Sequence, residues 1–197
     1  MTERKFFGTK SAEEIVEIIQ KFHGWQAPGV IIGVIMVDYA LSMLPEEAEK
    51  DAIVETSHCL PDSIQLFTPC TTGNGWMKVV DWDRFALTIY DKKTLAGFRV
   101  WLDPEKLKQY TDVNNWYMRL VPKKSLPLEV LNKAIFAADR GMLSGRAVTV
   151  TDLYGKKHKN SISICSGCGE PYVSTTGAVC RQCSGSGYFE YSSSGKE

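Results

Sequence analysis

The stretch APGVIIGVIMVDYALSML, residues 27–44, is the longest apolar run in the 197-residue chain. It is just long enough to cross a bilayer, but Asp38 interrupts it and two prolines, Pro28 and Pro45, bound it. Proline is favoured at the first position of a helix, where the backbone N–H has no helical partner. We therefore predict a buried helix from Pro28 to about Leu44 at the centre of a globular domain, and no membrane span.

Other regular elements flank this central helix. Ser11 and Glu14 form the pattern of a capping box, which predicts an amphipathic helix over residues 11–24 that stops at Gly24. Further helices are predicted over residues 61–67, 103–110 and 127–141, and strands over residues 52–57, 77–82, 84–91, 97–102 and 147–154. The strands cluster and do not alternate regularly with helices, so we predict an α+β main domain with mixed helices and strands.

The composition is that of an ordinary globular protein. Hydrophobic residues make up 44% and charged residues 23% of the chain, and Lys+Arg and Asp+Glu each count 23. No excess charge points to a nucleic acid or a membrane surface. The first residues, MTERKFFGTKSAEE, lack the apolar segment of a secretory signal, so we expect a cytoplasmic protein whose six cysteines are reduced thiols or metal ligands.

The composition changes at GKKHKNS, residues 155–161, a polar and basic connector followed by a short cysteine-rich segment. A solvated linker explains such a run more simply than a phosphate-binding patch does. We therefore predict two domains: a main domain over residues 1–155 and a four-cysteine zinc-binding domain over residues 156–197.

The second domain carries the motif CSGCGEPYVSTTGAVCRQC, residues 165–183, in which two Cys-x2-Cys pairs are separated by eleven residues. Such pairs supply four thiolates to one tetrahedral ion, normally zinc, and leave no coordination position open for a substrate. The segment GYFEYSS, residues 187–193, can add a strand to a zinc-ribbon or treble-clef-like fold. We predict one structural zinc per chain, bound by Cys165, Cys168, Cys180 and Cys183.

Two alternatives to zinc stay open at these four cysteines, iron and a redox dithiol. Iron in a rubredoxin-like site would use the same four ligands. A nucleic-acid-binding module would need clustered positive charge, but Arg181 is the only arginine or lysine in residues 160–191. We therefore do not expect a nucleic-acid partner.

A second pair of cysteines lies in HCLPDSIQLFTPCTTGNG, residues 58–75. Cys59 precedes a helix start, where backbone N–H groups lower the pKa of a thiol, and Cys70 precedes a glycine-rich turn. His23, at the end of the first helix, can approach both in space. One imidazole and two thiolates would suit zinc and leave one position open, with His58 as a spare ligand. In the structural alternative, the cysteines are small buried hydrophobes and His23 only forms a hydrogen bond.

The segments FHGWQAPGVIIGV (22–34) and HCLPDSIQLFTPCTTGNGWMKVVDWDRFALTIYD (58–91) resemble the FmdE family, named for the FmdE component of formylmethanofuran dehydrogenase. The resemblance covers nearly the whole chain, and its most specific feature is the spacing of Cys59, Asp62, Gln65, Cys70, Gly73 and Gly75. It implies an α+β domain with an appended zinc module, intimate dimers, and a place beside molybdenum- or tungsten-dependent one-carbon metabolism.

The chain departs from the family pattern at one point. Family members have FHGHxCPG, whereas this sequence has Trp25, Gln26 and Ala27 at the positions of the second histidine, the variable residue and the cysteine. The thiol of that cysteine is therefore missing at Ala27. The resemblance implies a weaker or emptier site than in members with the full pattern.

Three functions follow, in order of preference. The first is an accessory or ligand-binding protein of formylmethanofuran metabolism, with a second metal ion or a small molecule near His23, Cys59 and Cys70. The second is a metal- or thiol-dependent enzyme with those three residues as catalytic candidates; the third is a nucleic-acid-binding zinc protein. The sequence has no GxGxxG motif and no P-loop, and therefore no redox-cofactor motif. The sequence leaves open whether the protein is an enzyme.

The expected partners are a second copy of the chain and a small-molecule ligand or the dehydrogenase complex. A homodimer is expected because the apolar helix and four tryptophans exceed what a body of this size easily hides: Trp76, Trp82, Trp101 and Trp116.

Overall fold

The computed structural model divides the chain into two compact units, Met1–Tyr154 and Gly155–Glu197. We call them the main unit and the small unit and describe each by itself. The structure describes residues 4–122, 124–151, 161–174 and 177–190.

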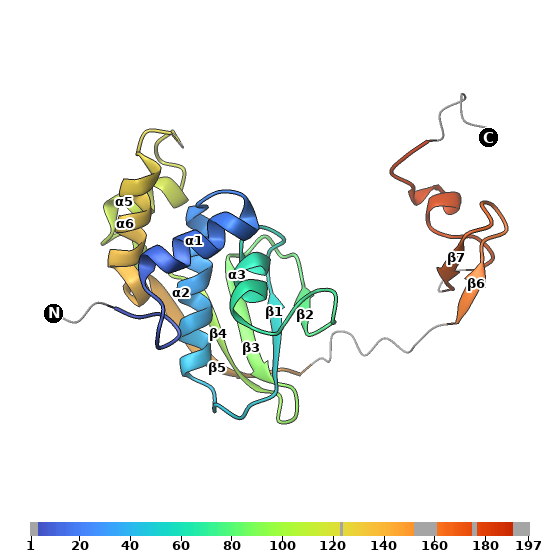
Figure 1. The fold of residues 1–197 in the computed structure, drawn as a ribbon, viewed down its shortest axis with the longest axis horizontal. Coiled ribbons are helices and arrows are strands. Elements are labelled where there is room, and N and C mark those ends of the chain that lie inside the picture. Colours follow the sequence, from blue (N-terminus) through green and yellow to red (C-terminus); the bar gives the residue numbers. More distant parts are fainter. Residues whose placement is uncertain (1–3, 123, 152–160, 175–176, 191–197) are drawn as a thin grey trace. The chain divides into compact units, whose positions relative to one another are not determined.

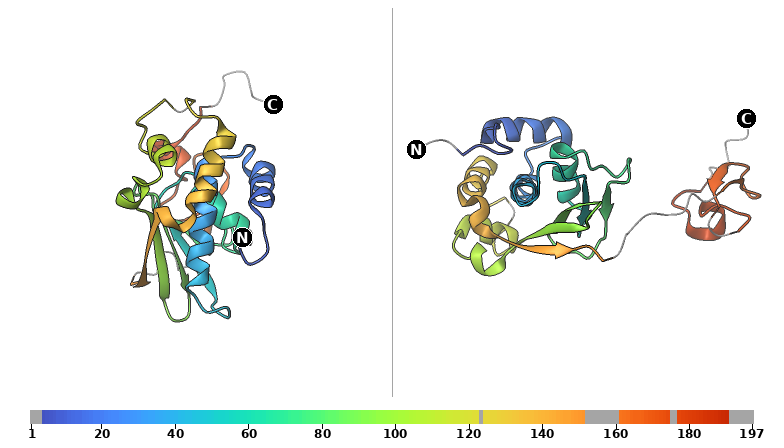
Figure 2. Two further views of the ribbon diagram at one scale, coloured as in Figure 1. Left: turned by 90° about the vertical axis from the view of Figure 1, so that its left-hand side faces the viewer. Right: turned by 90° about the horizontal axis from the view of Figure 1, so that it is seen from below.

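Helix α2 (Pro28–Ser42) is the centre of the main unit (Figure 1). Every residue from Pro28 to Asp38 is buried. Viewed end-on, the helix is enclosed by the other helices on one side and the sheet on the other (Figure 2, right). The predicted central buried helix is confirmed, and its apolar surface is covered by elements of the same chain.

The described residues contain no single helix that is long and apolar enough to cross a bilayer. Only α1 and α2 taken together reach that length and composition, and they are bent by 119° relative to each other.

Asp38 is accommodated in the apolar helix by two arginines. Its Oδ2 accepts from Arg4 Nη2 at 2.7 Å and Arg140 Nη2 at 2.8 Å, and its Oδ1 accepts from the Phe7 backbone N–H at 2.7 Å. Burial alone would raise the pKa of Asp38, but the bonds from Arg140, Phe7 and Arg4 outweigh it, and the pKa lies below its ordinary value. The charge that interrupts the apolar run therefore ties the N-terminal segment and residue 140 to the central helix.

Helix α1 (Ala12–His23) has the predicted capping box. The Glu14 N–H donates to Ser11 Oγ at 3.2 Å, and the Ser11 N–H donates to Glu14 Oε2 at 2.6 Å. Gly24 ends the helix with a φ of 91°, a left-handed conformation that favours glycine.

The remaining helices of the main unit are α3 (Leu60–Phe67), α4 (Pro104–Leu107), α5 (Thr111–Tyr117) and α6 (Leu128–Ala138), the last followed by a 3₁₀ turn, Asp139–Met142. Helix α5 was not predicted. The helix predicted over residues 103–110 is the shorter α4, whose N-cap Asp103 accepts from the backbone N–H groups of Glu105 and Lys106.

The main unit has one five-stranded sheet in the order β2-β1-β3-β4-β5, with β1 and β2 parallel and the other pairs antiparallel. The strands are β1 (Lys50–Val54), β2 (Met77–Val79), β3 (Ala86–Asp91), β4 (Ala96–Leu102) and β5 (Leu143–Thr149). The apolar residues that share a face of the three central strands are all buried: Ala52, Val54, Leu87, Ile89, Phe98 and Val100. The predicted α+β class is confirmed.

Several strand boundaries differ from the prediction. Strand β1 ends at Val54, and the carbonyl oxygen of Glu55 accepts instead from the N–H groups of Trp82 and Arg84 in the loop before β3. Strand β2 stops at Val79, and β5 begins at Leu143 and ends at Thr149. Residues 152–154 of the predicted last strand lie outside the described residues.

The small unit is built from a two-stranded hairpin, β6 (Ile162–Ile164) with β7 (Pro171–Val173), and a helical turn, Gln182–Ser186. The strand predicted over residues 187–193 is not found in its described part, residues 187–190, where the Tyr188 side chain is 95% exposed. Residues 191–193, and residues 155–160 of the predicted connector, lie outside the described residues.

Candidate functional site

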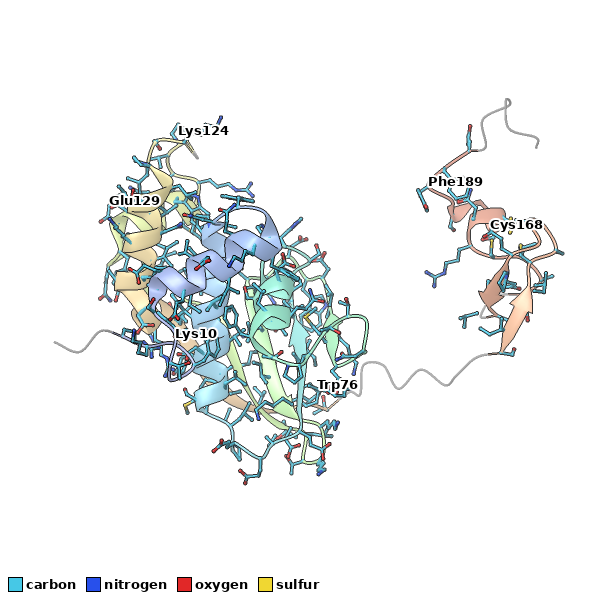
Figure 3. All side chains as sticks on the ribbon, viewed as in Figure 1. Lys10, Trp76, Lys124, Glu129, Cys168 and Phe189 are labelled. Carbon is cyan, nitrogen blue, oxygen red and sulfur yellow. The ribbon has the colours of Figure 1, made fainter. Side chains whose placement is uncertain are left out.

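The four cysteines of the small unit come together. The sulfur atoms of Cys165, Cys168, Cys180 and Cys183 all lie within 4.8 Å of one another, and those of Cys168 and Cys180 are 3.9 Å apart. Cys168 is labelled in Figure 3, close to the helical turn of this unit. Four thiolates at about 2.3 Å from one tetrahedral zinc would be roughly 3.8 Å apart. The cluster therefore fits a structural zinc.

The electrostatics of the cluster also favour a cation. The backbone N–H of Cys180 donates to Cys165 Sγ at 3.2 Å, and this bond is the main cause that lowers the pKa of Cys165 to about 6. The neighbouring sulfurs of Cys165 and Cys180 raise the pKa of Cys183 to about 12. A divalent ion removes this conflict because it stabilises all four thiolates together. The ligand set is complete without a substrate, so the ion has a structural and not a catalytic role.

A second location lies in the main unit, where three helix ends meet. Gly29 and Gly33 are one turn apart on α2 and face α3: a Cβ on Gly29 would lie 2.7 Å from Cys59 Sγ, and one on Gly33 would lie 2.8 Å from Ser63 Cβ. The missing side chains let the two helices pack closely, with their N-termini side by side. This packing places the thiol of Cys59 over the first turn of α2.

Cys59 adopts an unusual backbone conformation. It precedes α3 with φ 57° and ψ −55°, although it is not glycine and its side chain makes no capping bond. Positive φ is costly for residues with a Cβ, and such strain persists only where surrounding packing enforces it. The strand-to-helix connection from β1 to α3 therefore holds a half-buried thiol in one position.

His23, the last residue of α1, also reaches this junction. Its Nδ1 lies 2.6 Å from Asp62 Oδ2 in the first turn of α3, and both side chains are partly exposed. The carboxylate fixes the orientation of the ring and leaves Nε2 as the other ring nitrogen for a ligand or a proton.

Cys70 lies elsewhere in the core. It is buried, its thiol donates to the Lys50 backbone oxygen of β1 at 3.2 Å, and burial raises the pKa of this thiol. The glycine-rich turn after it is closed by its own bonds: Asn74 Oδ1 accepts from the N–H groups of Thr71 and Trp76. For Cys70 the structural alternative describes the surroundings better than a ligand site does.

The predicted three-ligand set is therefore not assembled in the structure. Among the described residues, only the four cysteines of the small unit gather three or more such ligand atoms within 4.8 Å. The physical reason is that Cys70 follows the end of α3 and turns into the core at the start of β1, whereas Cys59 and His23 lie at helix ends. His58, the predicted spare ligand, is exposed.

Two features of this junction were missed in the sequence. The first is the pairing of Asp62, in the first turn of α3, with His23. The spacing of Gly29 and Gly33 is a Gly-x3-Gly pattern, a known signal of close helix packing that could have located the contact with Cys59.

Comparison with known proteins agrees with this architecture. Residues 22–150 match the family described as "FmdE, Molybdenum formylmethanofuran dehydrogenase operon", and residues 156–190 match the "FmdE treble clef zinc finger". The chain belongs to the FmdE family. The resemblance seen in the sequence is thereby confirmed.

Two relatives of this FmdE chain match it over very different shares of its length. One is a tungsten formylmethanofuran dehydrogenase FmdE-like protein from Syntrophus aciditrophicus, whose sequence is 43% identical. Its crystal structure matches with a TM-score of 0.86 over 96% of this chain and 100% of that one. A "Probable S-adenosyl-L-methionine-binding protein" from Archaeoglobus fulgidus is 35% identical over 99 residues. That alignment spans 46% of this chain and only 27% of the relative, so the ligand in its name describes that longer protein.

Proposed function

We propose that this chain is a ligand-binding accessory protein of molybdenum- or tungsten-dependent one-carbon metabolism, in which Cys59 and His23 contact a metal ion or a small molecule. The zinc of the small unit has a structural role in this proposal. The link to formylmethanofuran rests on the family's name and on the tungsten-enzyme name of the structural neighbour.

The observation that carries the proposal is the position of Cys59. A residue with a Cβ and a positive φ stores strain, and glycine would relieve it at this position. A cysteine in its place indicates a use for the thiol. The thiol lies at the start of two helices, α2 and α3, where the helix dipoles place partial positive charge.

The pair of His23 and Asp62 supports the same location. A carboxylate that holds one ring nitrogen is the usual outer partner of a histidine that binds a metal through the other. Thiolate and imidazole form a soft ligand pair suited to zinc or a similar ion. Ala27, at the N-cap of α2 and buried, is where the family's cysteine would add a third ligand.

Titration with Co²⁺ tests the proposal, because cobalt thiolate bonds absorb in the near ultraviolet. The zinc of the small unit is first loaded to saturation. The wild type should then bind further cobalt weakly, and Cys59→Ser should lose that absorbance. Cys70→Ser is the matched control and should keep it, and Ala27→Cys should raise the affinity about tenfold or more. Equal cobalt binding by wild type and Cys59→Ser would contradict the proposal.

A thiol-dependent enzyme is the second candidate, and the strained strand-to-helix connection at Cys59 favours it. Nucleophiles of hydrolases occupy similar sharp turns between a strand and a helix, with a histidine and a carboxylate in support. Alkylation by iodoacetamide without added metal separates the candidates. The enzyme is favoured if Cys59 is alkylated much faster than Cys70 and cobalt does not change that rate. The binding protein is favoured if cobalt protects Cys59 from alkylation.

We further propose that the chain acts in the cytoplasm as a homodimer, alone or with the dehydrogenase complex. Phe22 and Trp25, which flank His23 in the sequence, are 54% and 51% exposed, and Trp76 and Trp82 are also exposed. Trp101 and Trp116 are half-buried and α2 is enclosed, so these elements give the dimer no support. Sedimentation at micromolar concentration should show twice 22.0 kDa; a single 22.0 kDa species would contradict the dimer.

A further inference from the structure

The main unit has a hollow that Phe85 separates from Cys59, where β3 begins and β4 ends. Its volume is about 420 Å³, within the size range of small-molecule sites. Two arginines and three aromatic rings dominate its lining: Arg84, Arg99, Phe85, Trp101 and Tyr117. The acidic residue in the lining, Asp83, is exposed.

The two arginines are held from beneath by one buried carboxylate. Glu55 is 4% exposed; Arg99 donates to it through Nε at 2.6 Å and Nη2 at 2.8 Å, and Arg84 Nη2 lies 2.8 Å from its Oε2. Burial would raise the pKa of Glu55, but the bonds from Arg99 and the charge of Arg84 reverse this and lower it. The carboxylate is therefore ionised and fixes both guanidinium groups.

This arrangement leaves binding capacity on the arginines. The bonds to Glu55 use two of the five N–H groups of Arg99, and Arg99 and Arg84 side chains are 25% and 55% exposed. Two guanidinium groups share one carboxylate, so the cluster carries a net positive charge before Asp83 is counted. Since a guanidinium presents donors in a planar fork, it suits the oxygens of a carboxylate or phosphate.

Flat rings surround these charges. The Arg84 guanidinium lies 4.8 Å from the ring centre of Trp82, and that of Arg99 lies 5.2 Å from that of Trp101. The rings of Phe85 and Tyr117 meet edge to face at 5.6 Å. Such walls favour a planar ring over a flexible aliphatic chain.

The hollow adjoins the Cys59 junction through Phe85. The same Cβ position on Gly29 that lies 2.7 Å from Cys59 Sγ lies 3.9 Å from Phe85 Cζ. The backbone also connects the hollow to Cys59. Glu55 begins the loop that ends at Cys59, and the carbonyl oxygen of Glu55 accepts from the N–H groups of Trp82 and Arg84.

We propose that this hollow binds the oxyanion, a carboxylate or a phosphate, of a small ligand with a planar ring, and that the ligand extends past Phe85 toward Cys59. The second half rests on the proposed function of Cys59, and the first half does not. The occupant follows from the chemistry of the lining: paired guanidinium donors for the anion, and aromatic walls for the ring.

Calorimetric titration with phenyl phosphate and with benzoate tests the anion site, with phenol as the neutral probe. Phenyl phosphate, benzoate or both should bind the wild type, and phenol should bind at least tenfold more weakly. Arg84→Gln should weaken anion binding about tenfold, the loss of one charge-assisted bond. Since Arg84 is exposed and Glu55 keeps its bonds to Arg99, this variant should fold, which urea unfolding checks.

Arg146→Gln is the matched control. Arg146 is the β5 partner of Arg99 and does not line the hollow, and its replacement removes the same charge, so the affinity of this variant should stay within twofold of wild type. Trp101→Leu should weaken phenyl phosphate more than inorganic phosphate. An equal loss in the Arg84 and Arg146 variants would show diffuse charge attraction and overturn the proposal, as would no anion binding.

Cys59→Ser separates this inference from the proposed function. Anion binding should persist in that variant, since its donors are Arg84 and Arg99. Phenyl phosphate at saturation should slow alkylation of Cys59 in the wild type at least fivefold. Anion binding without this protection would overturn the extension toward Cys59. Absence of anion binding in a wild type that still binds cobalt would overturn the anion site alone.

Discussion

The two units of this chain are stabilised in opposite ways. The main unit buries a continuous apolar core around α2, with residues such as Ile31, Ile35 and Ile89 fully covered. In the described part of the small unit, the only buried side chain is Cys165, and the apolar residues of its hairpin are exposed: Ile162 at 66%, Ile164 at 65% and Val173 at 53%. One unit has enough apolar surface to fold alone, and the other depends on its metal.

The largest expected effect is therefore removal of a zinc ligand. Cys180→Ser should unfold the small unit, because metal-linked folding free energy in such modules is about 10 kcal/mol or more. The main unit should remain folded, since no residue of its core is changed. Limited proteolysis and zinc analysis should show cleavage after residue 160 with the main fragment intact. A small unit that resists protease without zinc would break the comparison.

A buried charge provides the corresponding test of the main unit. Asp38→Ala leaves Arg4 and Arg140 without their shared carboxylate, which should cost about 3–5 kcal/mol of unfolding free energy. The control is Glu17→Ala on the surface of α1, whose bond to Lys21 is exposed to solvent and should contribute little to the unfolding free energy. Urea unfolding of both variants measures the difference. Similar losses would show that Asp38 is not a main anchor of α2.

Acid should weaken the main unit through the same carboxylates. The pKa values of Asp38 and Glu55 are lowered in the folded state, so their contribution is present above the unfolded pKa values of about 4 and is lost as pH falls through the folded ones. The slope of the unfolding free energy against pH should approach about 1.4 kcal/mol per pH unit for each group. Glu55→Gln should flatten it in urea unfolding between about pH 5 and pH 2; an unchanged slope would exclude Glu55 as a contributor.

Local sequence signals predicted much of this fold. The capping box at Ser11, the stop at Gly24 and the helix start at Pro28 depend only on neighbouring residues, and the structure has all three. Helix α5 had no such signal, because its N-cap residue is Tyr110 and makes no side-chain capping bond. The strand expected after the fourth cysteine also failed, since apolar letters alone do not form a strand without a partner.

The second location shows what sequence spacing leaves undetermined. Cys59 and Cys70 are both near α3 in the chain, yet one lies at the junction of helix ends and the other bonds to the backbone of β1. Their separation is decided by where the start of β1 lies relative to α3, which is a long-range feature. The partner of His23 was likewise hidden, because Asp62 is 39 residues away in the sequence.

The smallest expected effect concerns the capping box that begins α1. Ser11→Ala removes the oxygen that accepts from the Glu14 N–H and should cost about 1 kcal/mol of the unfolding free energy of the main unit. Ser11→Asp keeps an acceptor at the N-cap and should cost less. The small unit should show no change in zinc content or protease resistance, because its stability depends on metal and not on this helix. Urea unfolding followed by tryptophan fluorescence measures the first effect, and a loss above about 2 kcal/mol would mean that α1 contributes to the core through more than its cap.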